Sequence, residues 1–490
     1  MNARILKNRF NNNFKEVLSL VLIGGATSAS QYEGGFKDGK GVDTQDCRKY
    51  IIRTEKATTN TRLLSYTDIE EAQNNKELYY PFRKGSKGYE NSINDIELIS
   101  ELGLEIYRFS LSWSRLFPTG EEDEPNKKGV EFYDNIIKKL NDKGIKIFLT
   151  LNHYGIPINL IEKYGGWKNR KLINYYLNFT KFAIERWGRK VDYILPFNEI
   201  NAGYFSPYNG IGLLKNNENS YNEQDIFQGL HHQFVATAKT IKFAKKINIS
   251  ARFCSMISCF CYYPLTAKPK DNLKLLQDEQ MNQWFCSDIL LKGIYPYYAE
   301  KYFKDNNILV EFKKGDTEVL KNNTSEIFSF SYYSSSVVST TDQNQTAGNL
   351  VSTIKNPFLE ATDWGWQIDP IGLKITLHKA YDRYHVPLIV SECGLGEKDK
   401  LTDENNVHDQ YRIDYLQEHL SQVTSSIDEG VPVEAFISWG IIDIVSAGSC
   451  EMSKRYGVVY VDADNKGKGT YKRYKKDSFY WLKNYIKSKN

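Results

Sequence analysis

The sequence predicts an α/β fold, a single (β/α)8 TIM barrel with long loops after its strands. Short apolar runs alternate with longer segments of helical periodicity, which is typical of a parallel sheet built from βα units. The runs are nearly continuous in apolar residues, as expected for strands buried on both sides. Eight of them are predicted to be strands, at residues 21–26, 105–111, 145–152, 193–198, 251–257, 327–333, 387–391 and 434–439.

The segments between these strands indicate how the chain is organised. Helical periodicity is clearest at 92–102, 129–143, 171–187 and 225–244, whereas the polar stretches 38–89 and 313–325 are predicted to be long loops. No linker separates parts of the chain. We therefore expect one domain over residues 1–490, with 1–16 as a short N-terminal extension.

The N-terminal region has one feature that could be mistaken for a targeting signal. Basic residues precede the apolar run 17–23, but this run leads directly into Gly24 and Gly25 with no clear cleavage site. We predict that it enters the first strand. No apolar stretch reaches the roughly 18 residues that a membrane-spanning helix needs.

Charge and cysteine content argue against several kinds of partner. The chain has 64 Lys and Arg against 60 Asp and Glu, a balance that favours neither nucleic acid nor a membrane surface. The seven cysteines include no paired CxxC motif, so we expect buried free thiols in a reducing, cytoplasmic compartment. We expect no metal and no cofactor, and the oligomeric state is left open, with a homo-oligomer among the outcomes.

Polar residues gather where the predicted strands end, which in such barrels is where the chemistry takes place. Amides, imidazole and carboxylates hydrogen-bond sugar hydroxyls, and Trp can cover the apolar face of a pyranose. Each residue alone has an ordinary structural explanation, and only their convergence at one end of a barrel favours a sugar site. The strand-end residues are Gln31, Glu33, Arg108, Trp113, Asn152, His153, Tyr154, Asn198, Glu199, Tyr332, Tyr333, Glu392, Trp439 and Asp443.

Two of these residues, Glu199 and Glu392, provide the pair of carboxylates that glycoside hydrolysis requires. One carboxyl group must be protonated to release the leaving oxygen, and the other must be ionised to attack the anomeric carbon. Because a nearby cation lowers a carboxyl pKa, Arg108 could help to keep one of the two carboxylates charged.

Four segments carry recognisable motifs, and together they resemble family 1 of the glycoside hydrolases. Residues 196–199 resemble the family's acid/base segment, 389–394 its nucleophile segment, 24–33 its opening segment and 107–115 its second-strand signature. The resemblance runs from about residue 21 to 483. The chain departs from the usual pattern at three positions, where it has Ile23 for Trp, Ile200 for Pro and Cys393 for Asn.

The resemblance implies a retaining enzyme with Glu199 as acid/base and Glu392 as nucleophile. Their carboxyl groups are expected to lie about 5–5.5 Å apart, as retention requires. The neighbouring residues have roles toward the sugar or toward the nucleophile. Gln31, His153 and Asn198 would bind hydroxyls, Trp439 would stack beneath the sugar, and Arg108 and Tyr333 would orient Glu392 and keep it charged.

The loop after the eighth strand, residues 439–457, resembles the 6-phospho-β-glucosidase branch of the family. Ordinary β-glucosidases place Glu followed by Trp here, where this chain has Ser446 and Ala447. Losing a carboxylate suits a ligand that is itself an anion, since like charges repel. Lys454, Tyr456 and a serine, either Ser446 or Ser449, resemble that branch's phosphate pocket.

Two further observations refine the branch. Segments 330–333 and 361–366, the latter including Trp364, also resemble the phosphoglucosidases. The galactoside branch usually has Trp where this chain has Ala447, so a 6-phosphoglucoside is favoured over a 6-phosphogalactoside. The aglycone stays open, with Tyr204 and Tyr208 as candidate contacts.

The predicted function is retaining hydrolysis of 6-phospho-β-D-glucosides to glucose 6-phosphate and an aglycone. Phosphorylated cellobiose and phosphorylated aryl β-glucosides are the expected substrates, and such sugars arise and stay inside the cell. One alternative is a β-glucosidase or β-galactosidase acting on non-phosphorylated sugars. The other is an inactive sugar-binding barrel, which the presence of both glutamates disfavours.

Overall fold

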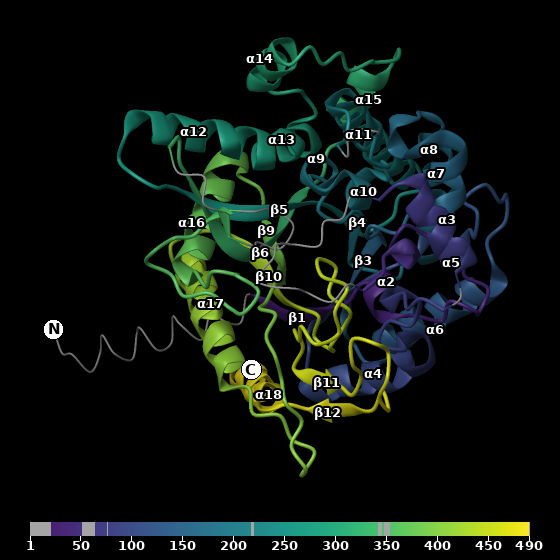
Figure 1. The fold of residues 1–490 in the computed structure, drawn as a ribbon, viewed down its shortest axis with the longest axis vertical. Helices are drawn as coiled ribbons and strands as arrows, with labels where there is room; N and C mark the ends of the chain where they lie inside the picture. The colour runs from purple at the N-terminus through teal and green to yellow at the C-terminus, as the bar shows by residue number, and fades with distance from the viewer. Residues whose placement is uncertain are drawn as a thin grey trace.

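The computed structural model describes residues 21–50, 64–75, 77–216, 220–341, 345–346 and 353–489. Eight parallel strands form a closed ring at the centre of the molecule (Figure 1). The ring closes because the first strand pairs with both the second and the last. In chain order the strands are β1 (Leu22–Ala26), β2 (Ile106–Ser110), β3 (Lys146–Asn152), β4 (Tyr193–Phe197), β5 (Arg252–Pro264), β6 (Ile327–Val338), β9 (Leu388–Cys393) and β10 (Val433–Trp439).

A long helix follows each barrel strand and leads back to the start of the next, so the predicted (β/α)8 barrel is confirmed. These helices surround the ring (Figure 1). They are α4 (Gly88–Leu102), α6 (Lys127–Asp142), α8 (Lys171–Trp187), α11 (Glu223–Lys246), α13 (Phe285–Lys292), α16 (Pro370–Tyr384), α17 (Gln410–Asp428) and α18 (Asp477–Lys489).

Shorter elements occupy the loops. The helices among them are α2 (Ala29–Tyr32), α3 (Tyr66–Asn74), α5 (Trp113–Leu116), α7 (Ile158–Tyr164), α9 (Ala202–Phe205), α10 (Pro207–Ile211), α12 (Pro269–Glu279), α14 (Tyr297–Asp305) and α15 (Asp316–Asn322), with the single turns η1 (Gln45–Cys47), η2 (Pro81–Arg83), η3 (Gly166–Lys168) and η4 (Gln280–Trp284). The small strand β8 (Thr353–Ile354) pairs antiparallel with the end of β6 and with β7 (Gln345–Thr346), and β11 (Val459–Val461) pairs with β12 (Arg473–Lys475).

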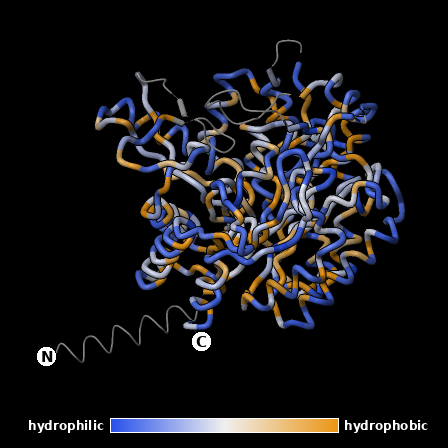
Figure 2. The backbone as a smooth tube through the Cα atoms, turned by 60° about the horizontal axis from the view of Figure 1, so that its bottom comes forward, coloured by the Kyte–Doolittle hydropathy of each residue, from blue (hydrophilic) through white to orange (hydrophobic). Residues whose placement is uncertain are grey.

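The apolar pattern explains why these segments form these elements. In β3, Ile147, Phe148 and Leu149 are all buried although they point to alternate sides, because both sides of a barrel sheet are covered. In α6, Asn126 caps the first turn by accepting from the backbone N–H of Lys128, and one apolar stripe faces the barrel. Figure 2 shows hydrophobic and hydrophilic residues alternating along the outer helices.

The structure corrects two of the predicted boundaries. Strands β5 and β6 run on together to Pro264 and Val338, beyond the predicted ends at 257 and 333. The predicted loop 313–325 contains α15, whose Val319 and Leu320 are buried. The long loop 38–89 is confirmed in outline but contains α3 and two single turns within its described residues.

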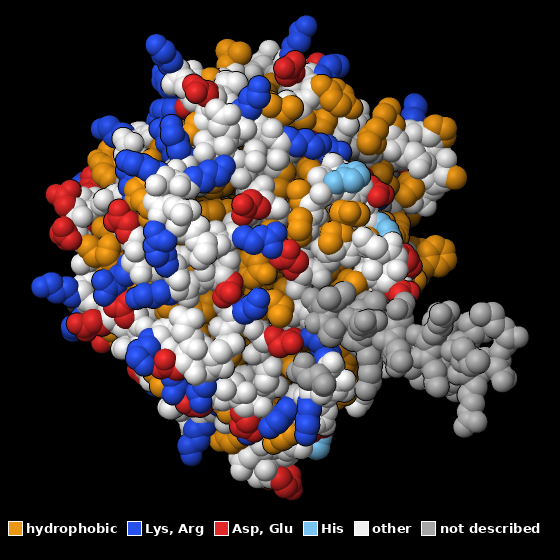
Figure 3. Space-filling view, turned by 180° about the vertical axis from the view of Figure 1, so that it is seen from behind, with side chains coloured by type: hydrophobic (Ala, Val, Ile, Leu, Met, Phe, Trp, Pro, Cys, Tyr) orange, Lys and Arg blue, Asp and Glu red, His pale blue; other side chains and the backbone are white. Residues whose placement is uncertain are grey.

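Several other expectations can be compared with the described residues. All seven cysteines are buried and free. No helix in the described part of the chain is long and apolar enough to cross a membrane, and no cluster of three potential metal ligands occurs there. On the face drawn in Figure 3, basic and acidic side chains are interspersed. Residues 1–16 lie outside the described residues, and one domain over the whole chain stays a prediction.

Candidate active site

Arg108 joins the strand ends that carry the predicted catalytic residues. Its Nη1 donates to Glu392 Oε1 at 2.6 Å and to the Ser391 carbonyl at 3.2 Å. Its Nη2 donates to Asn198 Oδ1 at 2.6 Å, and its Nε donates to Thr150 Oγ1 at 3.0 Å. The guanidinium is buried and connects β2 with β3, the end of β4 and β9. Parallel strands bring these residues to one end of the barrel, as predicted.

Glu392 has a hydrogen bond on each carboxyl oxygen. Arg108 binds Oε1, and the phenol of Tyr333 donates to Oε2 at 2.5 Å. Burial raises the pKa of Glu392 to about 7, a rise that Arg108 opposes and Glu199 increases. The expectation that Glu392 ionises readily beside Arg108 is therefore wrong in this structure, because the loss of hydration outweighs the attraction of the guanidinium.

Glu199 follows β4 and is buried opposite a different set of donors. Ser331 donates to its Oε1, and the phenol of Tyr154 donates to its Oε2. Its backbone has φ of 36°, a left-handed conformation that non-glycine residues seldom adopt. The next residue, Ile200, fixes this turn by donating its N–H to the Met256 carbonyl at 3.1 Å.

The residues predicted to bind the sugar lie close to these carboxyl groups. His153 is buried and stacks on Trp439, with ring centroids 5.4 Å apart. Burial, and then Arg108, lower the pKa of His153 well below its ordinary value, so its imidazole is neutral at working pH. Asn198 Nδ2 is buried without a hydrogen-bond acceptor among the described residues, and a sugar hydroxyl would supply one.

Gln31 connects the end of β1 to the loop 439–457. Its Nε2 donates to the Val445 carbonyl at 2.7 Å, and its Oε1 accepts from Ser28 Oγ at 2.7 Å. The backbone N–H of Val445 donates to the Gln31 carbonyl at 3.3 Å. Both ends of the predicted sugar-binding amide are therefore held by the protein, which fixes the orientation of the side chain.

Lys454 lies in a cluster of aromatic rings on the loop 439–457. Its ammonium nitrogen is 3.8 Å from the centre of the Trp366 ring, 5.6 Å from that of Trp364 and 5.9 Å from that of Tyr456. The Trp366 ring in turn lies 4.9 Å from that of Tyr333, which binds Glu392. The predicted cation is thus connected to the predicted nucleophile through two rings.

The hydroxyl groups of this cluster differ in their hydrogen bonds. Ser446 Oγ and the Tyr456 phenol oxygen are 2.9 Å apart and share a hydrogen bond. Ser449 Oγ is buried and has no hydrogen-bond partner in the part of the chain that the structure describes. Ala447 is half-buried between these two serines. A carboxylate also lies here, because Glu451 is buried and accepts from Trp364 Nε1 at 3.0 Å.

Buried ion pairs hold the backbone of the loop 439–457 in place. Lys476, which is fully buried, binds Asp399 and lies 3.0 Å from Asp443 Oδ1. Arg412 donates to the Tyr456 carbonyl at 2.8 Å and binds Asp409 at 2.9 Å. These contacts fix the loop backbone, so the side chains of the Lys454 cluster extend from a rigid support.

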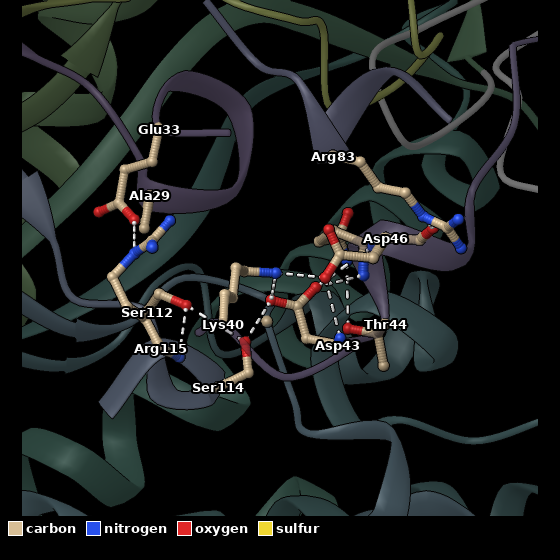
Figure 4. A network of polar contacts seen from close by, with 12 residues as sticks. Ala29, Glu33, Lys40, Asp43, Thr44, Asp46, Arg83, Ser112, Ser114 and Arg115 are labelled. Atoms are coloured by element: carbon tan, nitrogen blue, oxygen red, sulfur yellow. Dashed lines mark hydrogen bonds and ion pairs between the residues drawn. The ribbon is translucent and has the colours of Figure 1, made fainter. Parts of the chain in front are cut away.

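A second polar network lies behind the opening segment (Figure 4). Arg115 Nε binds Glu33 Oε2 at 2.8 Å, and Tyr133 donates to Glu33 Oε1 at 2.7 Å. Beside this pair, the ammonium of Lys40 lies between the carboxylates of Asp43 and Asp46. Glu33, which the sequence placed among the strand-end residues, is thus a structural partner of Arg115.

The sequence indicated Tyr154 only as a strand-end residue, and it did not single out Ser331 and Trp366, which the structure also places at the site. Tyr154 and Ser331 contact Glu199, and Trp366 contacts both Lys454 and Tyr333. All three lie within segments already chosen for their position after a strand or their family resemblance. The available signal was therefore adjacency to residues with predicted roles.

Comparisons with known proteins agree with this arrangement. The sequence profile of glycosyl hydrolase family 1 matches residues 13–490. The chain belongs to glycosyl hydrolase family 1. As a member of that family it is a retaining glycosidase, which confirms the family prediction.

Relatives and solved structures place this family 1 chain more closely. It is 40% identical over 469 residues to an aryl-phospho-β-D-glucosidase of Bacillus subtilis strain 168, covering 95% of this chain and 96% of that protein. It is also 40% identical over 472 residues to a 6-phospho-β-glucosidase of Clostridium longisporum, covering 95% and 96%. The family 1 β-glucosidase structure from Thermotoga maritima matches with a TM-score of 0.79, 26% identity and coverage of 96% and 97%.

Proposed function

We propose that this family 1 glycosidase hydrolyses 6-phospho-β-D-glucosides to glucose 6-phosphate and an aglycone. The observation that carries the proposal is the position of Lys454, a buried cation over Trp366, one ring beyond the tyrosine that binds Glu392. A sugar whose anomeric carbon meets Glu392 would direct its sixth carbon toward this cluster. The names of the relatives support the same substrate class.

In the first chemical step, Glu392 attacks the anomeric carbon as the bond to the leaving oxygen breaks. Glu199 gives its proton to that oxygen, and the aglycone departs. The product is an ester between the sugar and Glu392. Arg108 and Tyr333, which bind the two Glu392 oxygens, hold the attacking carboxylate in line and compensate its charge.

In the second step, Glu199 is ionised and takes a proton from water, whose oxygen attacks the anomeric carbon. The ester bond to Glu392 breaks, so the sugar leaves with its original configuration. Two displacements on one carbon require the carboxyl groups to lie about 5–5.5 Å apart, and we propose that separation for Glu199 and Glu392.

The phosphate would be held by Lys454 with the hydroxyl groups of Tyr456 and of Ser446 or Ser449. Near neutral pH a phosphate monoester has between one and two negative charges, and charge-assisted hydrogen bonds to it are worth about 1.5–3 kcal/mol each. Ser449 has an unused buried hydroxyl among the described residues, whereas Ser446 reaches the ligand as a pair with Tyr456. Ala447 is half-buried and stands where the galactoside branch usually has Trp, which favours a glucoside over a galactoside.

We further propose that the enzyme is cytoplasmic, because its substrate is made and kept inside the cell. We also propose that it has one domain and acts without cofactor or metal. The test is to compare hydrolysis of p-nitrophenyl β-D-glucoside with and without a 6-phosphate. We expect a higher kcat/KM for the phosphorylated compound. A preference for the non-phosphorylated glucoside or galactoside would establish the alternative function, and no turnover of either would favour a sugar-binding barrel.

A further inference from the structure

We propose that Tyr154 is a positioning residue for Glu199, holding one of its carboxyl oxygens in place for the proton transfers of the two chemical steps. The inference depends on the proposed function for the acid/base role of Glu199. The phenol of Tyr154 donates to Glu199 Oε2, and Ser331 donates to Oε1, so both oxygens are occupied. All three side chains are buried.

Toward an ionised Glu199, which only accepts hydrogen bonds, the phenol can act only as the donor. Burial raises the pKa of Tyr154 well above its ordinary value, and Glu199 raises it further. The phenol therefore keeps its proton throughout the working range of pH. Donation to a carboxylate stabilises the charged form relative to the neutral acid. The contact thus fixes the direction of the Glu199 carboxyl group.

The backbone around this contact is held in an uncommon conformation at both ends. Tyr154 has φ of 67° and Glu199 has φ of 36°, both in the left-handed region that disfavours residues with a Cβ. Such conformations persist only where surrounding contacts impose them. For Tyr154 those contacts come from the segment 42–46, because its carbonyl accepts from Thr44 Oγ1 at 2.7 Å.

The segment 42–46 is itself fixed by buried charges (Figure 4). Lys40 lies between the carboxylates of Asp43 and Asp46, with 2.9 Å from its Nζ to Asp43 Oδ2. Asp43 also accepts from Ser114 Oγ at 3.0 Å. The Thr44 N–H donates to the carbonyl of Ile156, two residues after Tyr154, at 3.0 Å.

The fit between the two segments is close. A Cβ atom placed on Gly155 would lie 3.0 Å from Asp43 Oδ2, so a larger residue beside Tyr154 would press on the Asp43 carboxylate. The network of Lys40, Asp43 and Asp46 therefore helps to fix the backbone from which the Tyr154 side chain extends.

The test replaces the phenol without changing the ring. In Tyr154→Phe, loss of the donor should move the alkaline limb of the kcat/KM pH profile upward by about one to two pH units, the shift expected for losing a hydrogen bond to a charged group. With a dinitrophenyl substrate, release of the first aglycone should stay fast while the steady-state rate falls about tenfold, since the second step needs ionised Glu199. The matched control is Tyr298→Phe, which removes a buried phenol bonded at 2.8 Å to Asp288 on the outer helices.

Thr44→Val provides a second variant that leaves the Tyr154 side chain intact. It removes the hydroxyl that holds the Tyr154 carbonyl, and it should shift the alkaline limb in the same direction by a smaller amount. If both variants fold and keep the parent's pH profile and steady-state rate, Tyr154 only fills space and the proposal is overturned. If Tyr154→Phe does not fold, Thr44→Val alone decides.

Both variants are assayed on whichever aryl glucoside the parent enzyme hydrolyses, with or without phosphate. A parent that prefers the non-phosphorylated sugar would overturn the substrate assignment and leave the Tyr154 test intact. An unchanged pH profile in the variants of an active parent would overturn only the role of Tyr154. The two failures are therefore distinguishable.

Discussion

Arg108 and Glu392 form a buried ion pair, with 2.6 Å between Nη1 and Oε1. A pair in this position has to overcome the loss of hydration of both groups, and here it does so only in part, because the pKa of Glu392 is raised to about 7. The pKa of the nucleophile therefore stays above that of an ordinary glutamate, and Arg108 limits the rise.

The first prediction concerns the acid limb of the pH profile. Glu392 attacks only when ionised, and its raised pKa means that the ionised form is lost as pH falls through about 7. We therefore expect kcat/KM to decline tenfold per pH unit on the acid side, with an apparent pKa near 7. Initial rates from pH 4 to 9 measure this, and a limb near pH 4.5 would contradict it.

The second prediction separates the two glutamates. Glu392→Gln should abolish turnover of every substrate, since no nucleophile remains. Glu199→Gln should slow substrates with poor leaving groups far more than dinitrophenyl glycosides, which depart without a proton. Rates across a series of phenols measure the difference. Glu434→Gln, a glutamate bound by Arg252 at the start of β10, is the matched control and should keep nearly full activity.

The third prediction concerns Lys454. Lys454→Ala should lower kcat/KM for the 6-phosphoglucoside by about ten- to a hundredfold, the value of one or two charge-assisted hydrogen bonds. Hydrolysis of the non-phosphorylated glucoside should hardly change, because that substrate has no group to meet the ammonium. The measured quantity is the ratio of the two activities.

A neighbouring lysine provides the control for this ratio. Lys398 lies 5.7 Å from the centre of the Trp364 ring, but it is exposed and paired with exposed Asp363. Lys398→Ala should leave the ratio unchanged. Equal losses for both substrates in Lys454→Ala would mean that Lys454 supports the loop and does not bind phosphate.

The fourth prediction concerns stability. Lys476→Met leaves the carboxylates of Asp399 and Asp443 buried without their shared cation, and should lower the free energy of unfolding by about 3–5 kcal/mol. Lys475→Met, next in the chain, removes only a partly exposed pair with Glu101 and should cost less than about 1 kcal/mol. Urea unfolding at pH 7 measures both. Similar losses would show that burial of the pair does not matter.

The fold could be predicted because buried parallel strands have a distinctive sequence. Runs such as 145–152 are apolar on both faces, and all eight runs correspond to barrel strands. The ends of β5 and β6 were missed because residues such as Ser334 and Ser335 interrupt the apolar pattern. They are strand residues through pairing with β5, a long-range contact that no local pattern contains.

The candidate site was predictable in its members and less so in its contacts. Glu199, Glu392 and Arg108 follow strand ends, and parallel topology alone brings such residues together. The contact between Tyr154 and Glu199 depends on left-handed backbone at both residues, and neither is a glycine that would indicate it. The pKa of Glu392 depends on the depth of burial, which neighbouring residues in the sequence do not reveal.

Lys476 and the loop 439–457 have a consequence for how the enzyme is made. The ribosome releases every predicted site residue before it releases the lysine that neutralises Asp399 and Asp443 beneath that loop. A nascent chain that ends at residue 470 would contain both glutamates and the whole Lys454 cluster, yet Asp399 and Asp443 would keep only their longer ion pairs with Arg412 and Arg455. The support beneath the loop 439–457 is therefore completed only after every predicted site residue has been synthesised.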